Sequence, residues 1–248
     1  MDTKCISPQT RDEDLPRLLT HVATDIGPIP DREALPAIHA ALEEQELLPE
    51  HQLVDAGYVD AESLVASQKE YHIDLVGPTA QDHRWQAREQ NGYALTDFSI
   101  DWEHEQARCP QGQQSHSWTP TRTGNQEVIK IKFGYTTCGA CPVRAQCTQS
   151  RQRTLTVRRR EAYVALEATR QRERTEEFAE LYAGRAGIEG VHAQGVRRMG
   201  LRRSRYIGEP RTHLQHVVTA TAMNLCRLHD WLEGISPQLP LSRTLLGL

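Results

Sequence analysis

The chain has 248 residues, of which 38% are hydrophobic and 25% charged, and its formal net charge is −4 at pH 7. This balance is that of a soluble globular protein with one large domain or two small ones, and it excludes a disordered chain. Because no apolar run approaches the ~20 residues of a membrane helix, and the N-terminus lacks the basic start and apolar core of a signal peptide, we expect a cytoplasmic protein with no membrane partner.

The first part of the chain alternates between strand and helix patterns. Residues 18–25 (LLTHVATD), 51–55 (HQLVD) and 73–78 (IDLVGP) have the length and apolar character of strands. Residues 32–48 and 60–71 place apolar side chains at helical spacing. The order strand, helix, strand, helix, strand predicts parallel strands joined by right-handed crossovers, and hence an α/β fold.

Residues 79–158 differ from the first part because they are polar and rich in turns. Strand patterns occur at 97–103 (DFSIDWE), 127–133 (EVIKIKF) and 153–159 (RTLTVRR). In the second of these, apolar side chains alternate with lysines, which is typical of a strand with one buried face. We therefore predict a small β-rich insertion.

Four of the six cysteines lie in this insertion, at the spacing of a metal site. Cys138 and Cys141 form a Cys-x2-Cys pair, preceded by Cys109 and followed by Cys147. Disulfides are not expected in a cytoplasmic chain, so the four thiolates can hold a tetrahedral Zn²⁺ in a structural role. Three alternatives stay open: reduced thiols without metal, an iron–sulfur cluster, or a histidine in place of one thiolate. The candidate histidines are His104 and His116.

From residue 159 onward the chain is predicted to be helical. A charged helix pattern over 161–187 is interrupted by Gly184 and Gly187, and a second helix is expected to begin near Ile188. Residues 212–233 form a strong final helix, whose apolar stripe predicts burial in the core. The stripe consists of Leu214, Val217, Val218, Thr221, Leu225, Leu228 and Leu232.

Two acidic residues are candidates for metal chemistry. Asp55 closes an apolar strand, and reactive groups in open α/β sheets gather beyond the carboxyl ends of parallel strands. Glu189 follows Arg185 by four residues, so the two share a helix face on which the arginine can fix the carboxylate. The alternatives are that Asp55 caps the turn into the next helix, and that Glu189 is a surface residue neutralised by its neighbours.

Several stretches together resemble the DDE-type transposases of bacterial insertion sequences, in the group with a Tyr-Arg-Glu-Lys signature. Tyr182, Arg185 and Glu189 stand as Tyr-x2-Arg-x3-Glu. The other matching stretches are HQLVDAGYVDAESL, YHIDLVGP, EVIKIKF, CGACPVRAQCT, the remainder of YAGRAGIEGVHAQGVRRMGLRRSRYIG, and THLQHVVTATAMNLCRL.

The resemblance implies an RNase H-like mixed sheet with flanking helices. It makes residues 1–78 and 159–235 the catalytic core, 79–158 the insertion, and 236–248 a tail. It also implies cleavage of DNA at transposon ends and strand transfer by a 3′-hydroxyl, with two Mg²⁺ or Mn²⁺ ions. By the same resemblance, Asp55 is the second catalytic acid and Glu189 the third, and the expected partners are DNA and a second copy of the chain.

The sequence departs from the family pattern at two places. The signature lysine falls at Val196, although Arg197 and Arg198 follow it and can contact phosphate. The first acid lies in the family on a strand upstream of residues 18–25, whereas Asp25 ends a later strand. The remaining candidates, in a polar segment without a strand pattern, are Asp2, Asp12 and Asp14. We therefore expect a truncated transposase that binds metal weakly and cleaves DNA slowly or not at all.

A basic tract follows the signature. Residues 1–105 carry 22 acidic against 7 basic residues, and residues 106–248 carry 11 against 22. Guanidinium groups at 196–211 can grip phosphate oxygens, and Tyr206 can stack on a base at a nicked end. The alternative is a helix face that pairs with the acidic first half. With Tyr182 and Arg185, the candidate DNA contacts are Arg197, Arg198, Arg202, Arg203, Arg205 and Tyr206; Arg211 completes the six arginines of the tract.

Two other classes compete with an incomplete transposase. One is a zinc-stabilised DNA-binding fragment without catalysis, and the other is a remnant or interaction domain whose charge split is purely internal. A DNA-binding measurement distinguishes the remnant or interaction domain, which should not bind DNA, from the other two classes, which should.

Overall fold

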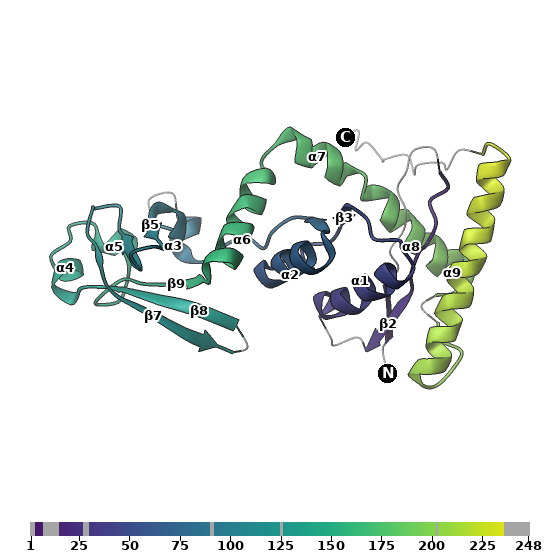
Figure 1. Ribbon diagram of the computed structural model, residues 1–248, viewed down its shortest axis with the longest axis horizontal. Coiled ribbons are helices and arrows are strands. Elements are labelled where there is room, and N and C mark those ends of the chain that lie inside the picture. The colour runs from purple at the N-terminus through teal and green to yellow at the C-terminus, as the bar shows by residue number, and fades with distance from the viewer. Residues whose placement is uncertain are drawn as a thin grey trace, which may run out of the picture. The chain divides into compact units, whose positions relative to one another are not determined.

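The computed structural model describes residues 3–6, 15–26, 30–89, 92–124, 126–201 and 203–235 (Figure 1). It is a mixed α/β structure with a helical C-terminus, as the sequence predicted, but its described strands form several small sheets instead of the single mixed sheet that we expected. The chain divides into two compact units. The first takes in Met1–Val59, Ala66–Pro78 and Arg172–Leu248, and the second takes in Asp60–Val65 and Thr79–Gln171.

The first unit contains two strand pairs. Strand β3 (His51–Leu53) runs parallel to β4 (Asp74–Val76), with His51 opposite Asp74, and α2 (Ala61–Tyr71) connects them. This confirms the parallel crossover predicted for the two strands. The strand predicted at 18–25 is shorter, β2 (Ala23–Ile26), and pairs antiparallel with β1 (Thr3–Ile6). Strand β1 was not predicted, because backbone pairing with β2 needs no apolar alternation in so short a segment.

Two helices flank these strands. The 3-10 helix η1 (Asp31–Ala34) leads into α1 (Leu35–Glu44), where Pro36 lies in the first turn and removes no helical hydrogen bond. Ile38 and Leu42 of α1 are almost completely buried. Asp60 precedes α2 and caps it, because its Oδ1 accepts a hydrogen bond from the Ser63 amide at 2.7 Å.

The C-terminal part consists of four helices: α6 (Arg160–Arg172), α7 (Glu176–Ala183), α8 (Ala186–Met199) and α9 (Glu209–Leu232). The predicted break near Gly184 is present between α7 and α8. None of the described helices is both long enough and apolar enough to cross a membrane.

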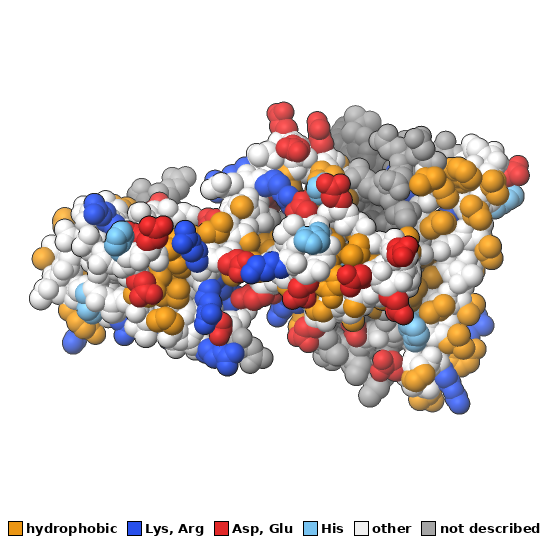
Figure 2. Space-filling view, viewed as in Figure 1, with side chains coloured by type: hydrophobic (Ala, Val, Ile, Leu, Met, Phe, Trp, Pro, Cys, Tyr) orange, Lys and Arg blue, Asp and Glu red, His pale blue; other side chains and the backbone are white. Residues whose placement is uncertain are grey.

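The predicted burial of the apolar stripe of α9 is wrong. Leu214, Leu225 and Leu232 are 63%, 64% and 68% exposed, and Figure 2 shows apolar side chains along this helix. The buried face is instead polar and small, and it faces β2 and α8. It lies inward because its groups find specific partners: Asn224 exchanges two hydrogen bonds with the backbone of Leu19, at 2.8 and 2.9 Å. The buried residues of α9 are Thr212, His216, Thr219, Ala220 and Met223.

Two histidines of the first unit are buried. His216, 3% exposed, shares a 2.8 Å hydrogen bond between its Nδ1 and the Thr24 hydroxyl. Burial lowers the pKa of His216 below 6.5, and the neighbouring His213 lowers it further. Burial also lowers the pKa of His39, against the opposing effect of its hydrogen bond to Gln52. Both imidazoles are therefore held in the neutral form in the folded protein.

We expect the free energy of unfolding to be constant above about pH 7 and to fall as the pH is lowered from 6.5 towards 5. In that window the unfolded chain binds protons that the folded chain excludes. Each buried histidine adds a slope of up to about 1.4 kcal/mol per pH unit. Urea unfolding at pH 7.5 and at pH 5.5 measures how much the free energy of unfolding falls between the two. This fall should be smaller in His216→Gln and unchanged in the exposed control His83→Gln. Equal slopes for all three proteins would contradict the prediction.

The second unit is rich in strands. β5 (Ser99–Asp101) and β6 (Gln106–Arg108) form a hairpin, and β7 (Ser115–Thr123), β8 (Gln126–Phe133) and β9 (Thr154–Arg158) form an antiparallel sheet in the order β7-β8-β9. The predicted alternation in β8 is confirmed, because its isoleucines and phenylalanine are buried and its lysines exposed. Short helical segments complete the unit: α3 (Trp85–Arg88), η2 (Leu95–Asp97), α4 (Tyr135–Gly139) and α5 (Arg144–Cys147).

Candidate functional site

Asp55 lies two residues beyond β3, where the chain leaves the β3–β4 pair. The Val54 amide still donates to the Val76 carbonyl at 2.9 Å, and a turn then closes between the Asp55 carbonyl and the Tyr58 amide. A Cβ at position 77 would lie 2.5 Å from the Val54 carbonyl oxygen, so only glycine permits this close approach of the two strand ends. Asp60 caps α2, which leaves the Asp55 carboxylate available for another role.

That role is an ion pair with Arg185. The Nη2 atom of Arg185 contacts Oδ1 of Asp55, whose side chain is 55% exposed, whereas that of Arg185 is only 19% exposed. The guanidinium also lies 5.9 Å from the ring centroid of Tyr182, which stacks on the buried ring of Phe178. The Arg185 guanidinium therefore has two contacts. The stacked rings of Tyr182 and Phe178 support it, and the Asp55 carboxylate pairs with it.

Glu189 is the fourth residue of α8, and Arg185 is the N-cap of that helix. The helical rise places the backbone of Glu189 about 6 Å further along the axis than that of Arg185. The side chains of residues 186–192, that of Glu189 among them, lie outside the described part of the structure. The helix that carries Glu189 nevertheless starts at the residue that binds Asp55.

The surroundings of Asp55 are negatively charged. Burial raises the pKa of the Tyr58 hydroxyl, and the carboxylates of Asp31, Asp55 and Asp25 raise it further. Arg185, which is paired with Asp55, is a cation that the structure places among these carboxylates. Among the side chains that the structure describes, no three His, Cys, Asp or Glu are arranged to hold a metal ion.

The basic tract begins in the last turn of α8 and continues into a loop that hydrogen bonds hold in place. Gln215 of α9 accepts from the Arg205 amide at 2.9 Å and donates to the Arg203 carbonyl at 3.0 Å. Tyr206 is 52% exposed. Five arginines of the tract are exposed and form no ion pair within the described residues: Arg197, Arg198, Arg203, Arg205 and Arg211. Arg202 lies outside the described residues.

Ion pairs between the acidic and basic halves of the sequence exist elsewhere. Besides Asp55 with Arg185, Asp74 pairs with Arg172 at 2.6 Å and Glu62 with Arg158 at 2.8 Å. The charge split is thus partly internal, but the basic tract does not take part in it within the described residues.

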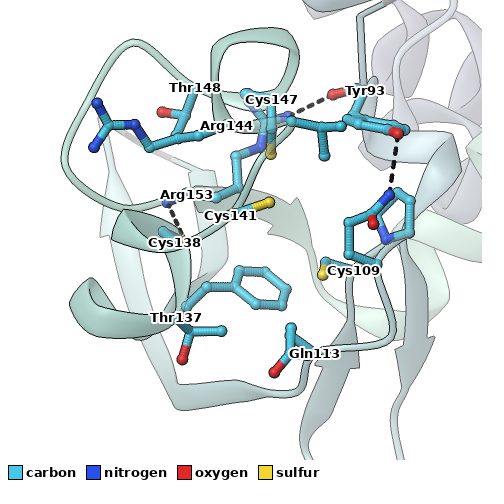
Figure 3. A pocket seen from close by; sticks show the side chains of 14 residues that line it. Tyr93, Cys109, Gln113, Thr137, Cys138, Cys141, Arg144, Cys147, Thr148 and Arg153 are labelled. Atoms are coloured by element: carbon cyan, nitrogen blue, oxygen red, sulfur yellow. Dashed lines mark hydrogen bonds between the residues drawn. The ribbon is translucent and has the colours of Figure 1, made fainter.

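The four clustered cysteines line one cavity of about 30 Å³ in the second unit (Figure 3). Cys109 comes from the loop after β6 and the others from the α4–α5 segment. Burial raises the pKa of the Cys147 thiol, Arg153 opposes this shift, and the other three cysteines add to it. The two candidate histidines do not line the cavity: His104 binds Asp101 at 2.7 Å, and His116 binds the Lys132 carbonyl at 3.0 Å.

Arg153 is the residue at this cavity that sequence reasoning missed. It is 6% exposed, although its position at the start of a strand pattern gives no sign of a special role. The only available signal is that an arginine precedes the apolar alternation of β9, six residues after Cys147.

Comparison with known families agrees with these features. Residues 108–229, just under half of the chain, match the model of the transposase DDE domain family. The matched range contains the cysteine cavity, the signature residues and the basic tract, and Asp55 precedes it. No curated protein and no solved structure matches the chain significantly. The match over residues 108–229 supports the resemblance to DDE-type transposases that the sequence predicted.

Proposed function

We propose that this protein cleaves DNA at the ends of an insertion sequence and joins the 3′-hydroxyl to target DNA, with Asp55 and Glu189 as ligands of two divalent metal ions. The observation that carries the proposal is the ion pair between Asp55 and Arg185. It joins the acid after β3 to the start of the helix that bears Glu189.

The residues present suit Mg²⁺ or Mn²⁺. Both ions prefer carboxylate oxygens, and Asp55 is exposed in a negatively charged setting with Arg185 on Oδ1, so Oδ2 can still bind a metal. When bound, the two metals would activate the attacking oxygen and stabilise the leaving one. Arg185, held by Tyr182, would fix the orientation of the Asp55 carboxylate.

The basic tract would hold the DNA. Arg197 and Arg198 would meet phosphates beside the catalytic helix, with Arg203 and Arg205 continuing along the backbone. Tyr206 offers an exposed ring on which an unpaired base can stack. None of these contacts reads base sequence, so they would position a strand rather than select it.

The proposed architecture is an RNase H-like core with an insertion, in the cytoplasm. Its support is the discontinuous first unit, which residues 79–171 interrupt. We also propose that Asp55 and Glu189 alone hold two divalent metal ions weakly, because two carboxylates screen two divalent cations poorly. Self-association stays a prediction from the sequence.

A plasmid-nicking assay in Mn²⁺, combined with DNA binding, tests this function. We expect DNA binding, no strand transfer, and at most slow nicking that Asp55→Asn abolishes. Nicking that persists in Asp55→Asn would show that Asp55 is not a ligand of the catalytic metal ions. Strand transfer by the unmodified chain would overturn the proposed weak metal binding, and absence of DNA binding at low salt would favour a remnant or interaction domain.

A further inference from the structure

The cysteine cavity has no part in the chemistry proposed above, yet the fold builds it from two distant segments. Strands β7 and β8 pair from Thr123 opposite Gln126 to Ser115 opposite Phe133, with one shift of register between Ser115 and Ser117. The end of β8 therefore lies beside the start of β7. This pairing brings the loop that contains Cys109 next to the start of α4, although 28 residues separate Cys109 from Cys138.

Tight turns present the thiols on both sides of the cavity. The Cys141 amide donates to the Cys138 carbonyl at 3.3 Å, and the Arg144 amide donates to the Cys141 carbonyl at 3.2 Å. On the other side, the Cys109 carbonyl accepts from Gly112, whose φ of +77° suits glycine. The cavity volume of about 30 Å³ exceeds the roughly 10–15 Å³ that one water molecule needs.

A buried cation adjoins the thiols. The Arg153 guanidinium donates to the carbonyls of Cys147 at 2.9 Å and Tyr93 at 3.2 Å, while its buried Nε has no hydrogen-bond partner. The backbone amide of Arg153 points at Sγ of Cys138, 3.5 Å away. Neutral thiols give this buried charge no counter-ion, which is costly in a protein interior.

We propose that Cys109, Cys138, Cys141 and Cys147 bind one structural Zn²⁺ that ties the β6–β7 loop to the α4–α5 segment. Four thiolates around Zn²⁺ carry a net charge of −2, which is the counter-charge for the Arg153 guanidinium. The Cys138 thiolate would also accept the hydrogen bond from the Arg153 backbone amide. In the described residues no three of the sulfurs stand in ligand geometry. Rotation about χ1 moves the sulfur of a cysteine, and the proposal includes such a rotation when the ion binds.

Zinc here would contribute to folding, not to catalysis. The site is filled by four protein ligands, which leaves no open position for a substrate or water. The segments that it joins are short: α4 has five residues and α5 has four. Helices of this length are unstable alone, so a cross-link by metal is a direct way to order them.

The test is the metal content of the full chain purified under reducing conditions. We expect about one zinc per chain, lost in Cys138→Ser/Cys141→Ser and retained in the control Cys226→Ser, whose thiol is exposed on α9. A strong chelator should lower the melting temperature of the wild type by about 10 °C. Cobalt substitution of the wild type should give thiolate-to-cobalt absorption, which reports the ligands even if the double variant fails to fold.

Protein that contains no zinc and takes up none when Zn²⁺ is added would overturn the proposal. So would zinc that persists in the folded double variant, or iron with a visible chromophore in place of zinc. Because the readouts are metal content and melting, the result is independent of whether the chain binds or cleaves DNA.

Discussion

Replacing Asp55 by asparagine is expected to weaken Mn²⁺ binding at least about tenfold, and replacing Glu189 by glutamine should have the same effect. Even partners that only support metal ligands contribute roughly 10–100-fold to affinity, and these two carboxylates are the assigned ligands themselves. Electron paramagnetic resonance of free Mn²⁺, titrated with protein, measures the affinity without requiring catalysis.

The double variant shows whether Asp55 and Glu189 bind metal at one shared site or at two different sites. If both carboxylates hold the same ions, Asp55→Asn/Glu189→Gln should lose little more than either single variant, because the effects of residues in one cluster are not additive. Glu180→Gln, on the exposed side of α7, is the matched control and should bind Mn²⁺ like the wild type. The Asp55 variant also removes the ion pair with Arg185, but a half-exposed pair is worth only about 0–1 kcal/mol. Strictly additive losses would contradict a common site.

Replacing Arg203 and Arg205 by glutamine is expected to weaken binding to duplex DNA and to flatten its salt dependence. Each phosphate contact releases counterions and adds about 0.9 to the slope of log K against log salt. Loss of two contacts should therefore lower the slope by about two units. Fluorescence anisotropy with a labelled duplex between 50 and 200 mM salt measures this change.

The matched control for the tract is Arg174→Gln, an exposed arginine in the turn between α6 and α7. It removes a positive charge outside residues 196–211 and should leave the slope almost unchanged. A flat salt response of the wild type, or equal changes in both variants, would show that the tract is not a phosphate-binding surface.

Much of the fold could be predicted because local patterns and tertiary packing agree. Strand β8 has alternating lysines and apolar residues and is buried on the predicted face. Strand β7 escaped prediction because it is polar and contains Pro120; as the edge of its sheet, it tolerates a residue that donates no hydrogen bond.

Helix α9 shows where a pattern misleads. Its apolar stripe has the spacing of a buried face, yet the structure buries the side with Thr212 and His216. That side is chosen by polar partners distant in sequence, such as Thr24 for His216, which no periodicity can reveal.

The candidate site was predictable residue by residue but not as a constellation. Spacing singled out Asp55 and Arg185, but not that they would form an ion pair across 130 residues of chain. Spacing likewise singled out the four cysteines, but not the buried arginine beside them. Such contacts depend on tertiary packing, which brings distant segments together.

A crystal structure grown with Mn²⁺ tests the central claim most directly, because anomalous scattering locates the ion independently of the model. We predict an ion within about 2.2 Å of oxygens from both Asp55 and Glu189, beside the Arg185 guanidinium. A structure in which the two carboxyl groups lie on separate faces of the molecule and share no ion would contradict the account.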